Sequence, residues 1–296
     1  MRRARSATGA STILPSITAT PRPAACASSR AVTILRARVI SSPDGEAWES
    51  MAFISEAGVD LRDPKLSVTP DGRLMLLGDR STWSQAGEQT YRSWVSFSDD
   101  GARWTPPQRI LGDGEWLWRV TWVEGQALGV AYFRSKEKGT WMSRLYASQG
   151  GVDYERLVEF SVLPGLTEAT LRAGDAGVLH CLHRRDEGTS TALLGTGRPP
   201  WKEWTWKDCG FYFGGPNVLL HGGRWYAAGR WMVGPPRTVL ARVGWERGTL
   251  EPVLELPSGG DTSYPGLVSQ GNELWISYYS SHEGKTAIYL ARVETE

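Results

Sequence analysis

The sequence is poor in cysteine, and its charges of opposite sign nearly cancel. Its three cysteines, Cys26, Cys181 and Cys209, form neither a disulfide framework nor a zinc-ligand spacing. The 33 lysines and arginines oppose 32 acidic residues, and the net charge of +1 argues against broad nucleic-acid binding. No apolar run approaches the roughly 18 residues that a membrane-spanning helix needs. We therefore expect an ordinary soluble globular protein without a membrane span.

Tryptophan and glycine are abundant, with 15 and 34 copies in 296 residues. Many aromatic residues among many turn-forming glycines favour an all-β protein of short strands. No segment shows sustained helical periodicity. The composition therefore predicts a single all-β architecture rather than a mixed one.

The first thirty residues differ from the rest of the chain. Residues 1–30 are basic and rich in Ser, Thr, Ala and Pro, and Pro15, Pro21 and Pro23 interrupt any apolar centre. A signal peptide needs a continuous apolar centre, so none is expected; a lipoprotein cleavage site before Cys26 is a weaker alternative. We interpret 1–30 as a disordered leader or a misassigned start, and assign no compartment.

A seven-residue turn pattern recurs along the chain. Residues 98–104 read Ser-Asp-Asp-Gly-Ala-Arg-Trp, in which Asp can hydrogen-bond its own turn, Gly permits a positive φ and Trp can pack the turn on a sheet. Residues 42–48 match this pattern, residues 148–154 keep Ser, Gly and an aromatic residue, and residues 195–201 keep only the final Trp. These spacings resemble the roughly 40–50 residues of a propeller blade.

A second pattern, strand, glycine turn, strand, predicts five units that begin near residues 63, 116, 167, 215 and 264. Residues 31–55 resemble the outer half of a further unit without its inner hairpin. Because an open ring would expose strand edges, we expect residues 31–296 to form one six-bladed β-propeller whose first blade is incomplete. Five blades plus an extra hairpin is the alternative.

The chain resembles the sialidase (neuraminidase) superfamily in its repeated turn and in three further segments. The seven-residue turn pattern is similar to the family's Asp-box, with one residue fewer. Arg62-Asp63-Pro64 resembles the family's Arg-Ile-Pro motif, and Glu168 followed sixteen residues later by Arg184 resembles a second segment. The stretch around Tyr264 resembles the segment that bears the family's nucleophile. The three occur in the family's order between about residues 36 and 296.

The resemblance implies a retaining, exo-acting hydrolase for terminal sialic acid or another acidic sugar, without a metal or other cofactor. Tyr264 would be the nucleophile and Glu168 its base, because a neutral phenol avoids the repulsion between two carboxylates. Arg62 and Arg184 would bind the sugar carboxylate bidentately. Arg185 is the alternative to Arg184.

The resemblance leaves the other site residues with alternatives. The third carboxylate-binding arginine would be Arg230 or Arg237, and Asn217 would line the central pocket. For the general acid, residues 81–96 offer only Glu88 where the family carries an Asp; Asp63 is the other choice, unless it only pairs with Arg62.

Two classes of function follow from these observations. The first is the sialidase-type hydrolase, whose partner would be a glycan or a small acidic sugar. The second is a non-catalytic glycan-binding or scaffold propeller, which the absent acid Asp and the incomplete first blade favour. The sequence assigns no oligomeric state.

Overall fold

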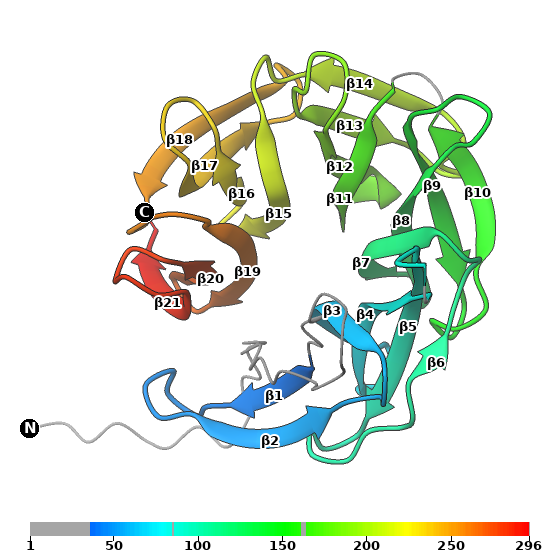
Figure 1. Ribbon diagram of the computed structural model, residues 1–296. Coiled ribbons are helices and arrows are strands. Elements are labelled where there is room, and N and C mark those ends of the chain that lie inside the picture. The colour runs from blue at the N-terminus through cyan, green and yellow to red at the C-terminus, as the bar shows by residue number, and fades with distance from the viewer. Residues whose placement is uncertain (1–35, 85, 161–163, 296) are drawn as a thin grey trace, which may run out of the picture.

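The computed structural model describes residues 36–84, 86–160 and 164–295, and in it the chain forms an all-β propeller. Five antiparallel sheets of three or four strands stand around a central axis in chain order (Figure 1). The predicted leader, 1–30, lies outside the described residues. No helix within these described ranges is long and apolar enough to cross a membrane.

Each blade begins with its innermost strand and runs outward (Figure 1). The strands are, blade by blade, β3 (Asp60–Val68), β4 (Leu74–Trp83), β5 (Gln89–Ser98) and β6 (Gln108–Arg109); β7 (Glu115–Val123), β8 (Gln126–Arg134), β9 (Trp141–Ser148) and β10 (Glu155–Phe160); β11 (Leu166–Ala173), β12 (Leu179–Arg185), β13 (Leu193–Gly197) and β14 (Trp204–Asp208); β15 (Phe213–His221), β16 (Arg224–Trp231), β17 (Arg237–Gly244) and β18 (Thr249–Glu255); and β19 (Ser263–Gln270), β20 (Glu273–Ser280) and β21 (Ala287–Glu294). A 3-10 turn, η1 (Asp175–Gly177), joins β11 to β12.

The prediction of six blades is wrong, and the alternative of five blades plus an extra hairpin describes the structure. β1 (Ala37–Ser41) and β2 (Glu49–Ile54) pair only with each other, so they form a two-stranded sheet without the inner strands of a blade. This hairpin lies between the first and the last blade (Figure 1). Its strands pack on the first blade, and its turn meets the last one, where the Asp44 carbonyl accepts a hydrogen bond from Arg292.

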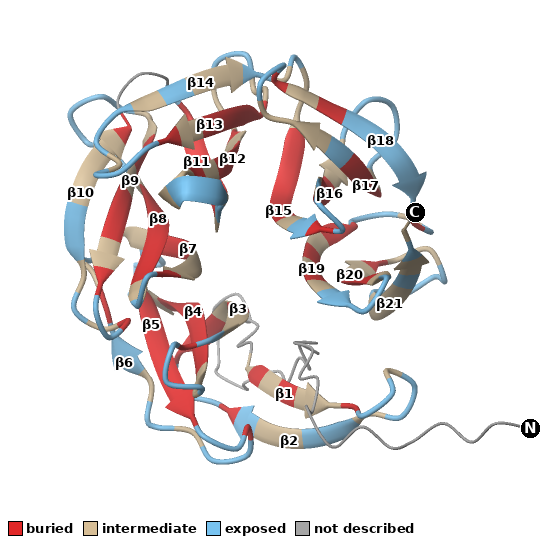
Figure 2. Cartoon of the chain, turned by 180° about the vertical axis from the view of Figure 1, so that it is seen from behind, coloured by how far each residue is buried: buried red, intermediate tan, exposed pale blue. Residues whose placement is uncertain are grey.

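Apolar side chains fill the spaces between neighbouring blades. The large fully buried residues include Trp94, Trp118 and Phe213. Figure 2 shows buried residues concentrated on strands such as β4 and β15, whereas the outer strand β18 is mostly exposed. Burial therefore follows position in the blade, with inner and middle strands covered on both faces by adjacent sheets and the outer strand left exposed.

The seven-residue pattern forms a hydrogen-bonded turn in its two full copies. In the second, Ser98 Oγ accepts from the Gly101 amide at 2.8 Å, and Asp100 Oδ1 accepts from the amides of residues 102 and 103. Trp104 closes the turn by donating from Nε1 to the Gly101 carbonyl at 2.9 Å. The copy at 42–48 repeats the Ser and Asp contacts, and Ser148 repeats the Ser contact. The faint fourth copy is not such a turn, because its start lies within β13.

The innermost strand of every blade bulges at the same place. At that point two residues stand opposite one residue of the neighbouring strand, which re-aims side chains and bends the strand. The positive φ angles of Asp63, Gly215 and Tyr264 (46°, 58° and 50°) fall at the first residue of three of these bulges, and each is followed by proline. The five bulges are Asp63–Pro64, Trp118–Arg119, Thr167–Glu168, Gly215–Pro216 and Tyr264–Pro265.

Candidate functional site

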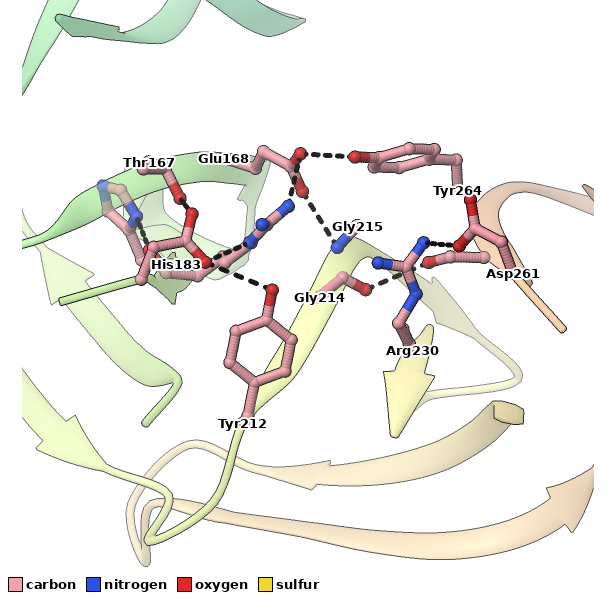
Figure 3. Close-up of polar contacts among 12 residues, drawn as sticks. Thr167, Glu168, His183, Tyr212, Gly214, Gly215, Arg230, Asp261 and Tyr264 are labelled. Carbon is pink, nitrogen blue, oxygen red and sulfur yellow. Dashed lines mark hydrogen bonds and ion pairs between the residues drawn. The ribbon is translucent and has the colours of Figure 1, made fainter. Parts of the chain in front are cut away.

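Glu168 is the centre of a hydrogen-bonded cluster near the axis. It lies in the bulge of β11 and is 4 % exposed. Its Oε1 accepts from the Tyr264 hydroxyl at 2.8 Å and lies 2.7 Å from Nη1 of Arg184, while its Oε2 accepts from the Gly215 amide at 2.9 Å (Figure 3). Three blades therefore meet at one carboxylate.

The bulges account for this convergence. Arg184, on β12, stands opposite the Thr167–Glu168 bulge, so the arginine and the carboxylate project from neighbouring strands at the same level. Tyr264 reaches Glu168 from two blades away because its own bulge sets the backbone at a φ of 50°. A residue other than glycine in this conformation is strained, and such strain is often found at functional sites.

The environment holds the phenol protonated. Burial is the largest cause that raises the pKa of Tyr264, and the negative charges of Glu168 and Asp63 raise it further. Burial also raises the pKa of Glu168, against the opposing effects of Arg184 and of the hydrogen bond from Tyr264. Tyr264 is thus a neutral phenol that already donates its proton toward a base.

A second layer of contacts holds Arg184. Its Nε lies 2.7 Å from Asp186 Oδ1, which also accepts from the Tyr212 hydroxyl at 3.2 Å, and Thr167 donates to the other oxygen of Asp186 at 2.8 Å. Thr167 and Tyr212, which both contact Asp186, are labelled in Figure 3. Two carboxylates on one guanidinium fix its plane.

Arg230 lies on the other side of Tyr264. Its guanidinium carbon is 5.8 Å from the centroid of the Tyr264 ring. Nη2 lies 2.6 Å from Asp261 and donates to the Tyr279 hydroxyl at 2.7 Å, and Nε donates to the Thr262 carbonyl at 2.9 Å. Of the two arginines considered for the third position, Arg230 is the one beside Tyr264.

Blade 1 contributes a separate group of charges. Arg62 pairs with the buried Asp60 at 2.6 Å, and its guanidinium lies over the ring of Trp83. Asp63, at the β3 bulge, is close enough for its charge to raise the pKa of both Glu168 and Tyr264, after burial as the main cause. Arg62 does not touch either of those two residues in the described chain.

Four other predicted residues lie outside the Glu168 cluster. Glu88 is exposed in the hairpin between β4 and β5. Arg237 pairs with Glu255 at 3.4 Å between the two outer strands of blade 4. Asn217 is buried near the axis and donates to the Pro265 carbonyl at 3.1 Å. Arg185, the alternative to Arg184, pairs instead with Asp208.

Sequence reasoning missed several members of the cluster. Asp186 and Tyr212 orient Arg184, and Trp118 has its ring centroid 5.5 Å from that of Tyr264. The signal for Asp186 was its position two residues after Arg184, but nothing in the sequence links Tyr212 to blade 3. The described chain contains no group of three or more His, Cys, Asp or Glu side chains that could hold a metal ion.

Comparisons with known proteins identify the fold. No protein-family model matches the sequence, and no curated protein matches it. A protein of unknown function from Dyadobacter fermentans superposes with a TM-score of 0.77 at 18 % identity, over 88 % of this chain and 84 % of that one. At identities this low the similarity shows the fold alone.

Two further solved structures are glycoside hydrolases. The α-L-arabinanase of Penicillium chrysogenum, complexed with arabinobiose, gives a TM-score of 0.70 at 13 % identity, over 88 % of this chain and 86 % of that one. The sialidase of Trypanosoma rangeli, complexed with 2,3-difluorosialic acid, gives 0.64 at 13 % identity, over 87 % of this chain and 49 % of that one. The chain therefore has a β-propeller fold that glycoside hydrolases also use.

Proposed function

We propose that this protein is an exo-acting, retaining glycoside hydrolase of sialidase type, which removes a terminal sugar that carries a carboxylate. The observation that carries this proposal is the 2.8 Å hydrogen bond from the Tyr264 hydroxyl to Glu168, flanked by two arginines. The two full copies of the Asp-box-like turn and the shared fold with sialidase support it.

Tyr264 would attack the anomeric carbon while Glu168 takes the phenol proton. The bond to the leaving oxygen breaks as the bond from the phenol oxygen forms, and a carboxylic acid protonates the leaving oxygen. Water then attacks the same carbon, with proton transfers reversed, and returns Tyr264 to its phenol form. The raised pKa of Tyr264 makes the adjacent base necessary.

Arg184 and Arg230 are the arginines placed to bind the sugar's carboxylate beside Tyr264. Arg184 is already paired with Glu168 and Asp186, and Arg230 with Asp261, so binding would add a further carboxylate to each rather than neutralise a free cation. Arg62 would be the third arginine from the blade 1 side. Guanidinium groups suit this task because they bind carboxylates in a fixed planar geometry.

Asp63 is our choice for the general acid. Its backbone occupies the equivalent bulge position in blade 1 to that of Tyr264 in blade 5. Its charge acts on both Tyr264 and Glu168, which supports a position beside the reacting atoms. Glu88 is exposed on the β4–β5 hairpin and makes no such contact with the cluster, so Asp63 is preferred.

The proposal is tested with a fluorogenic sialoside and a panel of other acidic glycosides. We expect Tyr264→Phe to lower kcat by at least about 10³-fold while substrate binding persists. Tyr278→Phe is the matched control, because it removes a hydroxyl from the same blade that only donates to the Pro257 carbonyl at 3.0 Å. Equal activity of Tyr264→Phe and wild type on a cleaved substrate would exclude this nucleophile.

A second candidate function is suggested by Arg184, because two carboxylates of its own chain already occupy its guanidinium group. In that case the propeller would bind glycans without cleaving them. Wild type that binds an acidic sugar by calorimetry but hydrolyses no member of the panel would support this second function.

A further inference from the structure

Three cationic side chains from three blades meet near the axis, at the bulge of one inner strand and after the bulges of two others. Lys65 on β3, Arg119 on β7 and Arg172 on β11 line one small cavity of about 30 Å³. Arg172 lies four residues after Glu168 on the same strand. We refer to Lys65, Arg119 and Arg172 as the cation cluster.

The hydrogen-bond partners of the cation cluster are neutral oxygens. Lys65 donates to the Asp63 carbonyl at 2.7 Å, and Arg119 donates from Nη2 to the Pro265 carbonyl at 3.1 Å. Arg172 donates to Thr121 Oγ1 and to Asn217 Oδ1, both at 3.0 Å. Within the described ranges none of the three cations forms an ion pair, and the buried Nε of Arg119 has no hydrogen-bond partner.

Removing these three positive charges from water without a contacting counter-charge costs free energy of folding. Burial is the main cause that lowers the pKa of Lys65 to about 7, that of Arg119 to about 9 and that of Arg172 to about 10. The negative charge of Asp63 opposes the lowering of the pKa of Lys65, and repulsion from Arg119 adds to it. Repulsion from Arg172 further lowers the pKa of Arg119, against the opposing charges of Glu168 and Asp63.

Buried charges in proteins are paired or bind ions of opposite sign, and the two buried arginines of the described chain, Arg80 and Arg185, pair with Glu56 and Asp208. The three cations of the cluster are half-buried and have no such pair among the described residues.

The site is distinct from the one that would hold a sugar. Trp118 is 1 % exposed, its ring centroid lies 3.6 Å from Lys65 Nζ, and the same ring lies 5.5 Å from that of Tyr264. Trp118 thus contacts both the cation cluster and the Glu168 cluster. A volume of about 30 Å³ has room for one small species of the size of a water molecule, and none for a sugar ring.

We propose that the cation cluster is a binding site for a small inorganic anion of halide size, held by Lys65, Arg119 and Arg172. The anion would accept hydrogen bonds from the free Arg119 Nε and from Lys65, and it would join blades 1, 2 and 3 at the axis. Its role is structural, so the proposal does not depend on the proposed hydrolase activity.

The experiment compares thermal unfolding in sodium chloride and in sodium gluconate at equal ionic strength and at pH 6.5, without phosphate. For wild type we expect Tm to be about 3 °C higher at a chloride concentration ten times the dissociation constant. In Arg119→Met the difference between the two salts should disappear. Arg103→Met, which removes a 91 % exposed arginine, should keep the wild-type difference.

A direct measurement keeps the proposal testable if Arg119→Met does not fold. Broadening of the ³⁵Cl resonance by wild type, reversed by excess bromide and absent for Lys65→Met, would support it. Equal Tm in the two salts for wild type, or an unchanged chloride response in folded Arg119→Met, would overturn it.

Discussion

The Glu168 cluster and the cation cluster share strand β11, on which Glu168 and Arg172 are four residues apart, and their charges are compensated differently. In the Glu168 cluster every arginine faces a carboxylate, with contacts of 2.6–2.7 Å at Arg184 and Arg230. In the cation cluster Arg119 and Arg172 donate hydrogen bonds only to carbonyl, hydroxyl and amide oxygens of the described chain, and Glu168 and Asp63 act on Arg119 only through their charge. The first cluster has carboxylates in direct contact with its arginines, whereas the second has none in contact within the described ranges, and we propose that an anion supplies that contact.

The difference shows that two neighbouring clusters on the inner strands have different surroundings. In one, a strained Tyr264 donates to the Glu168 carboxylate. In the other, cations without ion pairs in the described part of the chain surround a cavity too small for a sugar, with Arg119 in the bulge of β7 and Lys65 and Arg172 after the bulges of β3 and β11. Loss of one arginine should therefore have different consequences in the two clusters.

The largest effect is expected for Arg184→Met. It would leave Glu168, 5 % exposed in its side chain, without its main counter-charge, and we expect the free energy of unfolding to fall by about 3–5 kcal/mol. Arg119→Met should cost little or stabilise in chloride-free gluconate, because it removes a half-buried cation that, among the residues described, has no ion pair and whose buried Nε has no hydrogen-bond partner. Chemical denaturation of both variants in gluconate measures the contrast, and equal losses would contradict it.

Asp79 extends the comparison to an unpaired carboxylate. Burial raises its pKa from 3.8 to about 7, and its Oδ1 makes no hydrogen bond within the described chain. Between those pH values the folded protein keeps a proton that the unfolded chain releases, so stability falls as pH rises from 4 to 7.

Asp79→Asn removes this titration. The free energy of unfolding of the variant relative to that of wild type should therefore increase as pH rises, by up to about 4 kcal/mol at pH 7. Urea unfolding across that pH range measures this difference. Asp113→Asn, which alters an exposed carboxylate, is the control, and its free energy of unfolding should depend on pH as that of wild type does. A constant difference between Asp79→Asn and wild type at all pH values would refute the assigned shift.

The smallest effect is expected for Asn217→Asp. Asn217 Oδ1 already accepts from Arg172 at 3.0 Å, so a carboxylate here would supply part of the negative charge that the cation cluster lacks. The loss of the hydrogen bond from Nδ2 to the Pro265 carbonyl offsets part of the gain. We expect stability in gluconate to change by no more than about 1 kcal/mol, while the chloride-dependent rise in Tm is at least halved. An undiminished chloride response would place the anion away from Arg172.

Sequence reasoning reached the local features of the fold. The expected unit starts at residues 63, 116, 167, 215 and 264 fall within the first four residues of β3, β7, β11, β15 and β19. Gly72, with a φ of 85°, forms the turn expected between the first two strands of blade 1. These features depend on residues close in sequence, so local patterns can predict them.

Other features escaped it because they depend on distant parts of the chain. The sequence suggested a sixth blade, but residues 37–54 pair only with themselves. Arg119 and Arg172 attracted no attention, since each reads as an ordinary strand residue. Glu88 was considered for the acid from its position in the blade, yet its hairpin leaves it exposed.

By itself the sequence determined a series of strand–turn–strand units, since these follow from neighbours in the chain. The residues proposed to bind and cleave an acidic sugar came instead from the resemblance to the sialidase superfamily. Only the tertiary structure decided which of those residues share the axis. Glu168 and Tyr264 are 96 residues apart and meet because bulges at one level of the ring aim them at each other. The same closure brought Lys65, Arg119 and Arg172 together, because inner strands of a propeller converge whatever charges they carry.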